Sequence, residues 1–289
     1  SMSTLREQIG RNHEDFMTYS RNCANAVRQE AFRTDPQKYQ KHLGQSAGRL
    51  LNITEHATAI DSSEKHKRAE FYSLYGSYIS WIAATNLKQS AETKGIDITR
   101  EQKQLTTEVY SRFNDSLREV FNRYGKSTTP AEVMQALDTL VPISRSNYHR
   151  REMSRTITGV RTEMLSELAL ATMGLETRRA EPEEDRRGID YFVTIGDREV
   201  ALDIKTSPRG EEKANQRNFR YGDETIAICP FSRRTLNEIP TILPADPYGQ
   251  MLEPAQEMLG RMFRLETITD AEYREIKEDL DWQLQEAYV

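Results

Sequence analysis

Two short β-rich runs, residues 189–195 and 199–206, limit the folds open to this chain more than any other feature of its sequence. Gly196-Asp197 separates them, and two such runs around a two-residue Gly-Asp turn are typical of a β-hairpin. With that turn, Tyr191 faces Leu202 and the neighbouring pairs on the same face are also apolar. That face should therefore pack against a core, and a one-residue slip would expose it.

The opposite face of the hairpin would carry charged side chains. In the same register Asp190 faces Asp203, and Lys205 lies two residues further along. Directly opposed side chains lie about 5 Å apart, and two carboxylates that close need a shared proton or a cation. A hard divalent metal with oxygen ligands is the simplest solution, with the lysine placed to stabilise an anion during attack on a phosphodiester. A salt-bridge cluster on a half-exposed sheet is the alternative.

These residues resemble the signature of the PD-(D/E)XK nuclease family, with Ile189 where the name-giving proline would stand. The resemblance implies a restriction-endonuclease-like mixed sheet flanked by helices. It also implies that Asp190 and Asp203 are the acidic metal ligands, that the carbonyl of Ile204 is a further ligand, and that Lys205 is the catalytic lysine.

The same family often adds a glutamate from the helix before the first strand. Glu163 and Glu167 are the candidates, in a helix predicted over residues 160–173 and ended by Gly174. Glu163 lies eleven residues before that glycine, a separation similar to that of resolvase-like members, so we prefer it as the fourth catalytic and metal-binding residue. Glu167 would then be a solvated helix residue.

A basic segment that also contains amide side chains follows the second β-rich run. Arginine and amide side chains contact phosphates and base edges, so we predict a DNA-facing loop at this position. A solvated loop is nearly as plausible, because Glu211 and Glu212 interrupt the run. Asn215 also lies in the run, and the predicted DNA ligands are Arg209, Lys213, Gln216, Arg217 and Arg220.

The first half of the chain has the pattern of helices. Leu105 begins an apolar stripe that recurs every four residues as far as Phe121. Residues 71–82 form an aromatic-rich stripe, which we interpret as packing inside a helical bundle in preference to a base-stacking platform. Capping boxes are predicted at 129–132 and 269–272.

The second half mixes helices with strands. Beyond the hairpin we predict a charged loop over 181–187, a strand over 225–229, and helices over 249–264 and 270–287.

Composition excludes several classes of protein. The 289 residues carry a net charge of −5 and include no apolar run long enough for a membrane span, and we expect no signal peptide. The two cysteines lie far apart, which suits a reducing cytoplasm. Residues 124–128 imitate the end of a phosphate-binding loop but lack its first glycine, so no nucleotide cofactor is expected.

These observations predict an α/β (α+β) protein in two parts. Residues 1–150 would form a helical region for dimerisation and DNA grip, and residues 151–289 a catalytic domain with a helical C-terminal extension. The resemblance implies an endonuclease that depends on Mg²⁺, with Mn²⁺ able to substitute, and that cuts double-stranded DNA. Size and layout resemble a type II restriction endonuclease acting as a homodimer. A structure-selective repair or junction nuclease, and a catalytically silent DNA-binding or scaffold protein, are the alternatives.

Overall fold

A computed structural model of the chain describes residues 100–140 and 147–289, together with isolated positions between 74 and 97. Contacts divide the chain into two compact units, residues 1–156 and 157–289. The division falls inside helix α7 (Asn147–Thr172), and the boundary predicted at residue 150 lies in the same helix.

The first unit contains helices α5 (Arg100–Tyr124) and α6 (Pro130–Leu140). The predicted apolar stripe is confirmed, because its members on α5 from Val109 to Phe121 are at most 1% exposed. The side chain of Leu105 lies outside the described residues. At the start of α6 the predicted capping box is also present, with reciprocal hydrogen bonds between the backbone and side chains of Thr129 and Glu132.

The aromatic-rich stripe packs in the core at the positions that the structure describes. Tyr78 and Trp81 are buried, and their rings lie 5.8 Å and 5.6 Å from the ring of Phe113 on α5. Phe71 and Ile82 lie outside the described residues. Buried rings cannot stack on nucleic-acid bases, so these two aromatics serve packing, as predicted.

The second unit is built on a four-stranded mixed sheet. Its strands lie in the order β1 (Glu176–Arg179), β2 (Tyr191–Ile195), β3 (Arg198–Ile204), β4 (Ile226–Ile228). The first two pairings are antiparallel and the third is parallel. The predicted mixed sheet flanked by helices is therefore present.

The β2–β3 hairpin has the predicted register from Tyr191↔Leu202 to Ile195↔Arg198. Gly196 adopts φ +65°, a left-handed value that a two-residue hairpin turn requires and glycine tolerates. The predicted core face is buried, with Tyr191 and Leu202 both 0% exposed. The alternation of apolar and polar residues and the two-residue Gly-Asp turn were thus sufficient to predict how the two strands pair.

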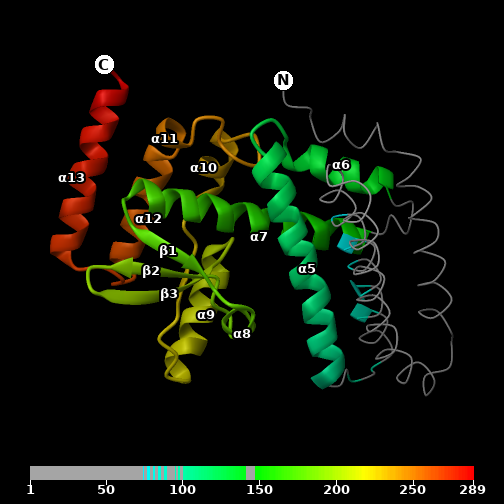
Figure 1. The fold of residues 1–289 in the computed structure, drawn as a ribbon. Helices are drawn as coiled ribbons and strands as arrows, with labels where there is room; N and C mark the ends of the chain where they lie inside the picture. Colours follow the sequence, from blue (N-terminus) through cyan, green and yellow to red (C-terminus); the bar gives the residue numbers. More distant parts are fainter. Residues whose placement is uncertain are drawn as a thin grey trace, which may run out of the picture. The chain divides into compact units, whose positions relative to one another are not determined.

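Seven helices surround the sheet or extend from it in this part of the chain (Figure 1). The hydroxyl of Tyr191 on β2 donates to Glu167 of α7, which crosses one face of the sheet. The other helices are α8 (Pro182–Arg186), α9 (Pro208–Arg220), α10 (Arg233–Glu238), α11 (Pro247–Gln250), α12 (Leu252–Arg264) and α13 (Asp270–Ala287). Helix α13 begins at the predicted capping box of Thr269 and Glu272, and none of the described helices is both long and apolar enough to cross a membrane.

Two segments predicted as loops are helical. Residues 181–187 contain α8, which begins at a capping box formed by Glu181 and Glu184. The predicted DNA-facing loop is helix α9, because Ser207 caps it by accepting from the amide of Gly210, 3.1 Å away, and Pro208 suits its first turn.

Strand β1 was not predicted from the sequence. Its residues, Glu176–Arg179, are polar and mostly exposed, so they show no apolar alternation. The strand forms because its backbone pairs with β2, which is a tertiary contact.

Candidate active site

The two predicted acidic residues lie at the end of the hairpin that is remote from the turn. The regular β2–β3 ladder ends at Tyr191↔Leu202. The amide of Asp190 donates to the same Leu202 carbonyl, 2.8 Å away, so two residues of one strand oppose a single residue of the other, as in a β-bulge. Asp190 therefore does not face Asp203 directly in the ladder, as the simple register predicts.

The bulge turns the Asp190 side chain toward β3. Its carboxylate accepts a hydrogen bond of 2.7 Å from the amide of Ile204, which follows Asp203 in the chain. The Asp190 carboxylate is thus bonded to the peptide group that joins Asp203 to Ile204, at the end of β3. Asp203 itself is 5% exposed, so this second face of the hairpin is buried where it carries the acid.

Lys205 neutralises part of this charge. Its Nζ lies 2.9 Å from a carboxylate oxygen of Asp203, while its backbone amide donates to the carbonyl of Ile228 on β4, 2.7 Å away. The backbone bond ties the lysine backbone to the parallel β3–β4 pair, and the ion pair with Asp203 directs its ammonium group. About a third of the Lys205 side chain remains exposed, and a substrate could reach it.

Both aspartates hold their protons more strongly than an ordinary aspartate. Burial raises the pKa of Asp190 well above its usual value, the negative charge of Glu163 raises it further, and the amide of Ile204 opposes both effects. Burial also raises the pKa of Asp203, although the hydrogen bond and charge of Lys205 hold that rise back. Acidic groups therefore gather at this end of the hairpin, where the charges of Glu163 and Asp203 both raise the pKa of Asp190.

The two candidate glutamates of α7 have different surroundings. Glu163 is half-buried, and its charge acts on the carboxyl of Asp190. Glu167 is exposed and accepts a hydrogen bond of 3.2 Å from the Tyr191 hydroxyl. The structure thus brings the preferred candidate, Glu163, within electrostatic range of Asp190 and gives Glu167 a packing contact.

The two aspartate carboxylates at the end of the hairpin are suitable ligands for Mg²⁺. Within the residues that the structure describes, no three His, Cys, Asp or Glu side chains are grouped to hold a metal ion. Mg²⁺ is usually bound through one or two carboxylates and keeps several of its waters. Asp190, Asp203 and the carbonyl of Ile204 are oxygen donors of this kind, and a bound cation would favour the ionised form of both carboxyl groups.

Helix α9 carries all five predicted DNA ligands on one exposed stripe. Each of positions 209, 213, 216, 217 and 220 lies three or four residues from another of the five, which places them on the same side of a helix. All five are exposed, whereas Glu211, Ala214 and Asn218 on the opposite side are buried. The charge of Arg217 lowers the pKa of Asp203, so this basic stripe lies within electrostatic range of the acidic site.

The buried side of α9 contains residues whose roles the sequence did not reveal. Asn215, included among the amides that could contact bases, instead exchanges two hydrogen bonds of 2.8 Å with the backbone of Ala227 on β4. Asn218 donates to the carbonyl of Thr225, also at 2.8 Å. Both amides cover the free edge of β4, a role that depends on tertiary packing and gives no sequence signal.

Glu211 is also structural. It is 3% exposed, forms an ion pair with Arg261 of α12, and accepts a hydrogen bond of 2.7 Å from the amide of Cys229. The interpretation of Glu211 as a solvated interruption of a basic loop is therefore wrong. Glu212, its neighbour, is exposed and does match that interpretation.

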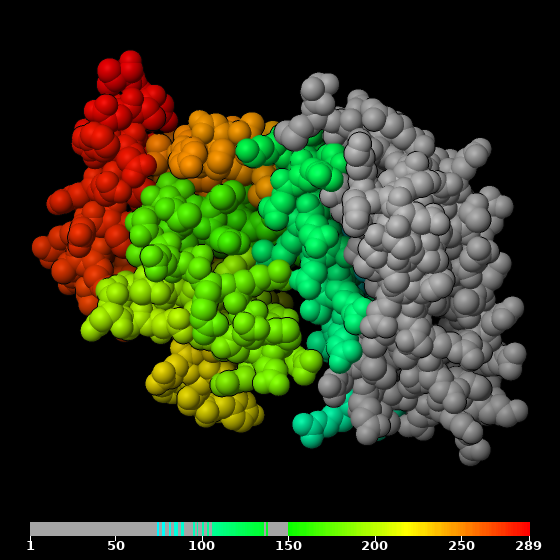
Figure 2. Space-filling view, viewed as in Figure 1, coloured from blue at the N-terminus to red at the C-terminus, as the bar shows by residue number. Residues whose placement is uncertain are grey.

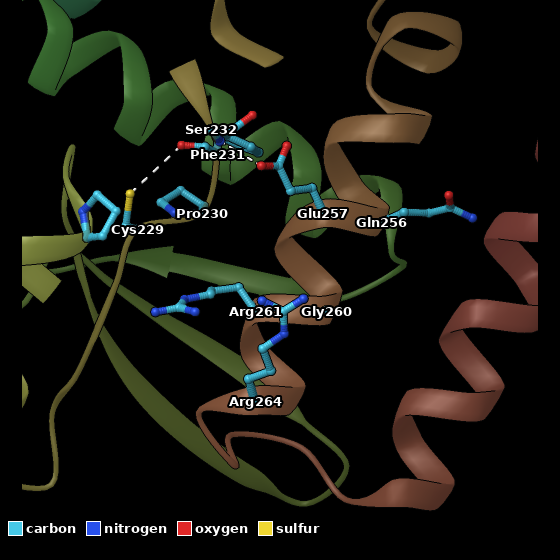
Figure 3. Close-up of a pocket in the computed structure, with 10 residues that line it drawn as sticks. Cys229, Pro230, Phe231, Ser232, Gln256, Glu257, Gly260, Arg261 and Arg264 are labelled. Atoms are coloured by element: carbon cyan, nitrogen blue, oxygen red, sulfur yellow. Dashed lines mark hydrogen bonds between the residues drawn. The ribbon is translucent and has the colours of Figure 1, made fainter. Parts of the chain in front are cut away.

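A cavity of about 370 Å³ lies between the segment after β4 and helix α12 (Figure 3). None of the predicted site residues lines it. Arg261 and Arg264 enter it from successive turns of α12, and the thiol of Cys229, whose pKa burial raises, donates to the carbonyl of Phe231. Since Arg261 is already paired with Glu211, the cavity is a weaker candidate for a catalytic site than the end of the hairpin.

Comparison with models of protein families, with curated proteins and with solved structures found no match. The PD-(D/E)XK resemblance thus stays a prediction carried by residues 163–205. Function has to be argued from the geometry and charge of the site.

Proposed function

We propose that this chain is a metal-dependent DNA endonuclease that hydrolyses phosphodiester bonds with Mg²⁺. The observation that supports this best is a pair of carboxylates at the end of β3: buried Asp203, paired with Lys205, and half-buried Asp190, which accepts from the amide of the next residue, Ile204. Acids whose pKa values are raised by burial and that lie beside a specific charged partner are candidates for a functional site.

Each residue has a distinct role in this proposal. Asp190, Asp203 and the Ile204 carbonyl would hold the ion, and Glu163 adds negative charge to their environment. When bound, Mg²⁺ lowers the pKa of a water molecule and neutralises charge on the phosphate. Lys205 orients the attacking water and stabilises the extra negative charge that the phosphate acquires as the leaving oxygen departs.

Helix α9 would hold the nucleic acid. Its exposed stripe from Arg209 to Arg220 offers guanidinium and ammonium groups to successive phosphates, and Arg217 brings that stripe within range of Asp203. The side-chain amide of Gln216 donates to Glu212 at 3.3 Å and would exchange that contact for one with DNA.

Cleavage tests the catalytic assignment directly. Long duplex, branched and single-stranded DNA are incubated with the full chain, with and without Mg²⁺. We expect metal-dependent products, and a loss of rate of about 100-fold or more in Asp203→Asn and in Lys205→Ala, because each change removes charge that the transition state needs.

Glu224→Gln is the matched control, since this exposed carboxylate lies between α9 and β4. It should cleave like the unchanged protein. Undiminished cleavage by Asp203→Asn would show that the site has been placed wrongly.

Two subtypes of the proposed enzyme follow from the sequence. A type II restriction endonuclease would act as a homodimer, because two equivalent sites related by a two-fold axis can cut both antiparallel strands. Light scattering of the full chain on DNA tests this, and discrete fragments from unbranched duplex would accompany a dimer. A structure-selective nuclease would instead cut only branched or partly unpaired DNA.

A DNA-binding protein without catalysis is the second candidate. It is favoured by the ion pair of Lys205 with Asp203 and by the lack, among the described residues, of a three-side-chain metal group. Calorimetric titration with Mn²⁺ separates the two candidates. Binding that disappears in Asp190→Asn supports the nuclease, and no binding even with DNA present supports the second candidate.

A further inference from the structure

Two aromatic side chains at the C-terminal end of α9 are largely exposed to solvent. Phe219 is 90% exposed and Tyr221 is 75% exposed. Figure 2 shows this end of α9, in yellow, projecting from the lower edge of its unit. Exposed rings of this size cost free energy in water, so their grouping at a projection points to a ligand that covers them.

The backbone that carries these rings is held in place. Asn218, which precedes Phe219 in the last turn of α9, is buried and donates to the carbonyl of Thr225. The amide of Tyr221 donates to the carbonyl of Arg217 at 3.1 Å, and the following turn passes through Gly222 at φ +65°. The fixed backbone limits the ordering that binding requires to the rotation of the two side chains.

Cationic groups border the rings. Arg217 and Arg220 are exposed on the same helix end, and they continue the basic stripe that runs within range of Asp203. A ligand that combines negative charge with flat π-faces satisfies both features. Nucleic acid with unpaired bases is such a ligand, because its phosphates meet the arginines while its bases stack on the rings.

Two other strongly exposed aromatics of the described chain lie beside acidic residues and have no arginine next to them in sequence. Trp282 on α13 is 61% exposed, but Asp281 precedes it and Glu278 lies one turn before it. Tyr248 is 86% exposed and follows Asp246 closely. Acidic neighbours repel phosphates. Asp223 and Glu224 also follow Tyr221 closely, but Arg217 and Arg220 lie at the same end of α9 and offset their charge.

We propose that Phe219 and Tyr221 form a stacking platform for unpaired bases, and that the substrate is DNA with a single-stranded segment next to a duplex. Bases inside a duplex are already stacked on their neighbours and do not offer their faces to side chains. The inference rests on the proposed nuclease function and selects its structure-selective subtype.

Binding by the full chain in EDTA, where no cleavage interferes, tests the platform. The probes are a duplex with a single-stranded tail that contains 2-aminopurine, and a blunt duplex of equal length. We expect the protein to quench 2-aminopurine fluorescence by stacking. Phe219→Ala with Tyr221→Ala should weaken binding of the tailed DNA about tenfold or more, and binding of the blunt duplex less than about twofold.

Two matched variants sharpen this comparison. Trp282→Ala removes an exposed ring from an acidic helix and should change neither affinity. Phe219→Leu with Tyr221→Leu keeps apolar surface but removes the π-faces, so it should behave like the alanine variant, while Phe219→Trp should retain tailed-DNA binding. Leucine variants that bind and quench like the unchanged protein would overturn the stacking assignment.

The remaining outcomes separate the inference from the nuclease proposal. If the chain cleaves DNA with Mg²⁺ and the alanine variant still binds tailed DNA normally, the platform is wrong and the nuclease stands. If the alanine variant loses tailed-DNA binding while no variant cleaves, the platform stands and the catalytic proposal fails. A change from dimer to monomer in the alanine variant, with DNA binding unchanged, would assign the rings to a second copy of the chain and overturn the inference.

Discussion

The chemistry proposed for this chain depends most on a single carboxyl group, that of Asp190. Burial and the charge of Glu163 make its ionised form unfavourable, and one backbone hydrogen bond from Ile204 compensates only in part. Function and stability oppose each other here, because the ionised carboxylate that a cation requires is the form that the metal-free fold tolerates least.

Replacing this carboxyl with an amide should therefore stabilise the metal-free protein at neutral pH. A raised pKa in the folded state means that the folded protein binds more protons than the unfolded chain, so stability falls as pH rises from the unfolded pKa through the folded one. Asp190→Asn removes that loss. Urea unfolding in EDTA should show the variant more stable than the unchanged protein at pH 8, with the difference shrinking near pH 4.

A gain that is equal at both pH values would show that Asp190 is not strained by its ionisation. Mg²⁺ provides a second comparison. It should raise the stability of the unchanged protein at pH 8 and leave Asp190→Asn unaffected, because the amide removes one proposed ligand.

At the scale of the element, helix α9 combines three surfaces in thirteen residues. One side is buried and holds the edge of β4 through Asn215 and Asn218. The opposite side is the basic stripe, and the C-terminal end presents Phe219 and Tyr221. Because residues on different sides of a helix face different surroundings, one side of α9 can pack into the core while the others present arginines and aromatic rings to a ligand.

The basic stripe should determine how DNA affinity depends on salt. Each phosphate neutralised by a cationic side chain releases about one counterion, so the logarithm of the binding constant falls linearly with the logarithm of salt concentration. Lys213→Ala with Arg217→Ala should reduce the magnitude of that slope by about 2 and weaken binding to all sequences.

Fluorescence anisotropy at several salt concentrations measures this slope. Arg274→Ala is the control, because this exposed arginine lies on α13, away from the stripe in sequence. An unchanged slope in the double variant, or an equal change in the control, would remove α9 from the DNA interface.

At the scale of the whole molecule, the second unit depends on contacts between distant segments. Glu211 on α9 pairs with Arg261, fifty positions away on α12, and accepts from the amide of Cys229 after β4. One buried carboxylate thereby joins two helices and the end of a strand. Replacing Glu211 leaves the partly exposed guanidinium of Arg261 without this partner and weakens the hydrogen bonds that the carboxylate accepts.

Glu211→Gln should accordingly lower the free energy of unfolding by about 2 kcal/mol. Denaturant unfolding of the full chain measures the change. Glu212→Gln alters the adjacent, exposed glutamate and should stay within about 0.5 kcal/mol of the unchanged protein. Equal effects in the two variants would contradict the structural role of the buried ion pair.

The sequence by itself determined the features that depend on neighbouring residues. The hairpin register followed from alternation and a two-residue turn. The helix starts at Thr129 and Thr269 followed from a capping residue and a glutamate three positions later. Such signals are readable because the interacting groups lie within a few residues and their geometry hardly depends on the rest of the molecule.

Only the tertiary structure decided the features whose partners are remote in sequence. Strand β1 exists because β2 offers it a backbone to pair with, and the bulge at Asp190 exists because Leu202 offers it a carbonyl. Glu211 is buried because Arg261 compensates its charge. A polar residue looks the same in sequence whether it is solvated or paired, and folding decides between the two by bringing its partner within hydrogen-bonding distance.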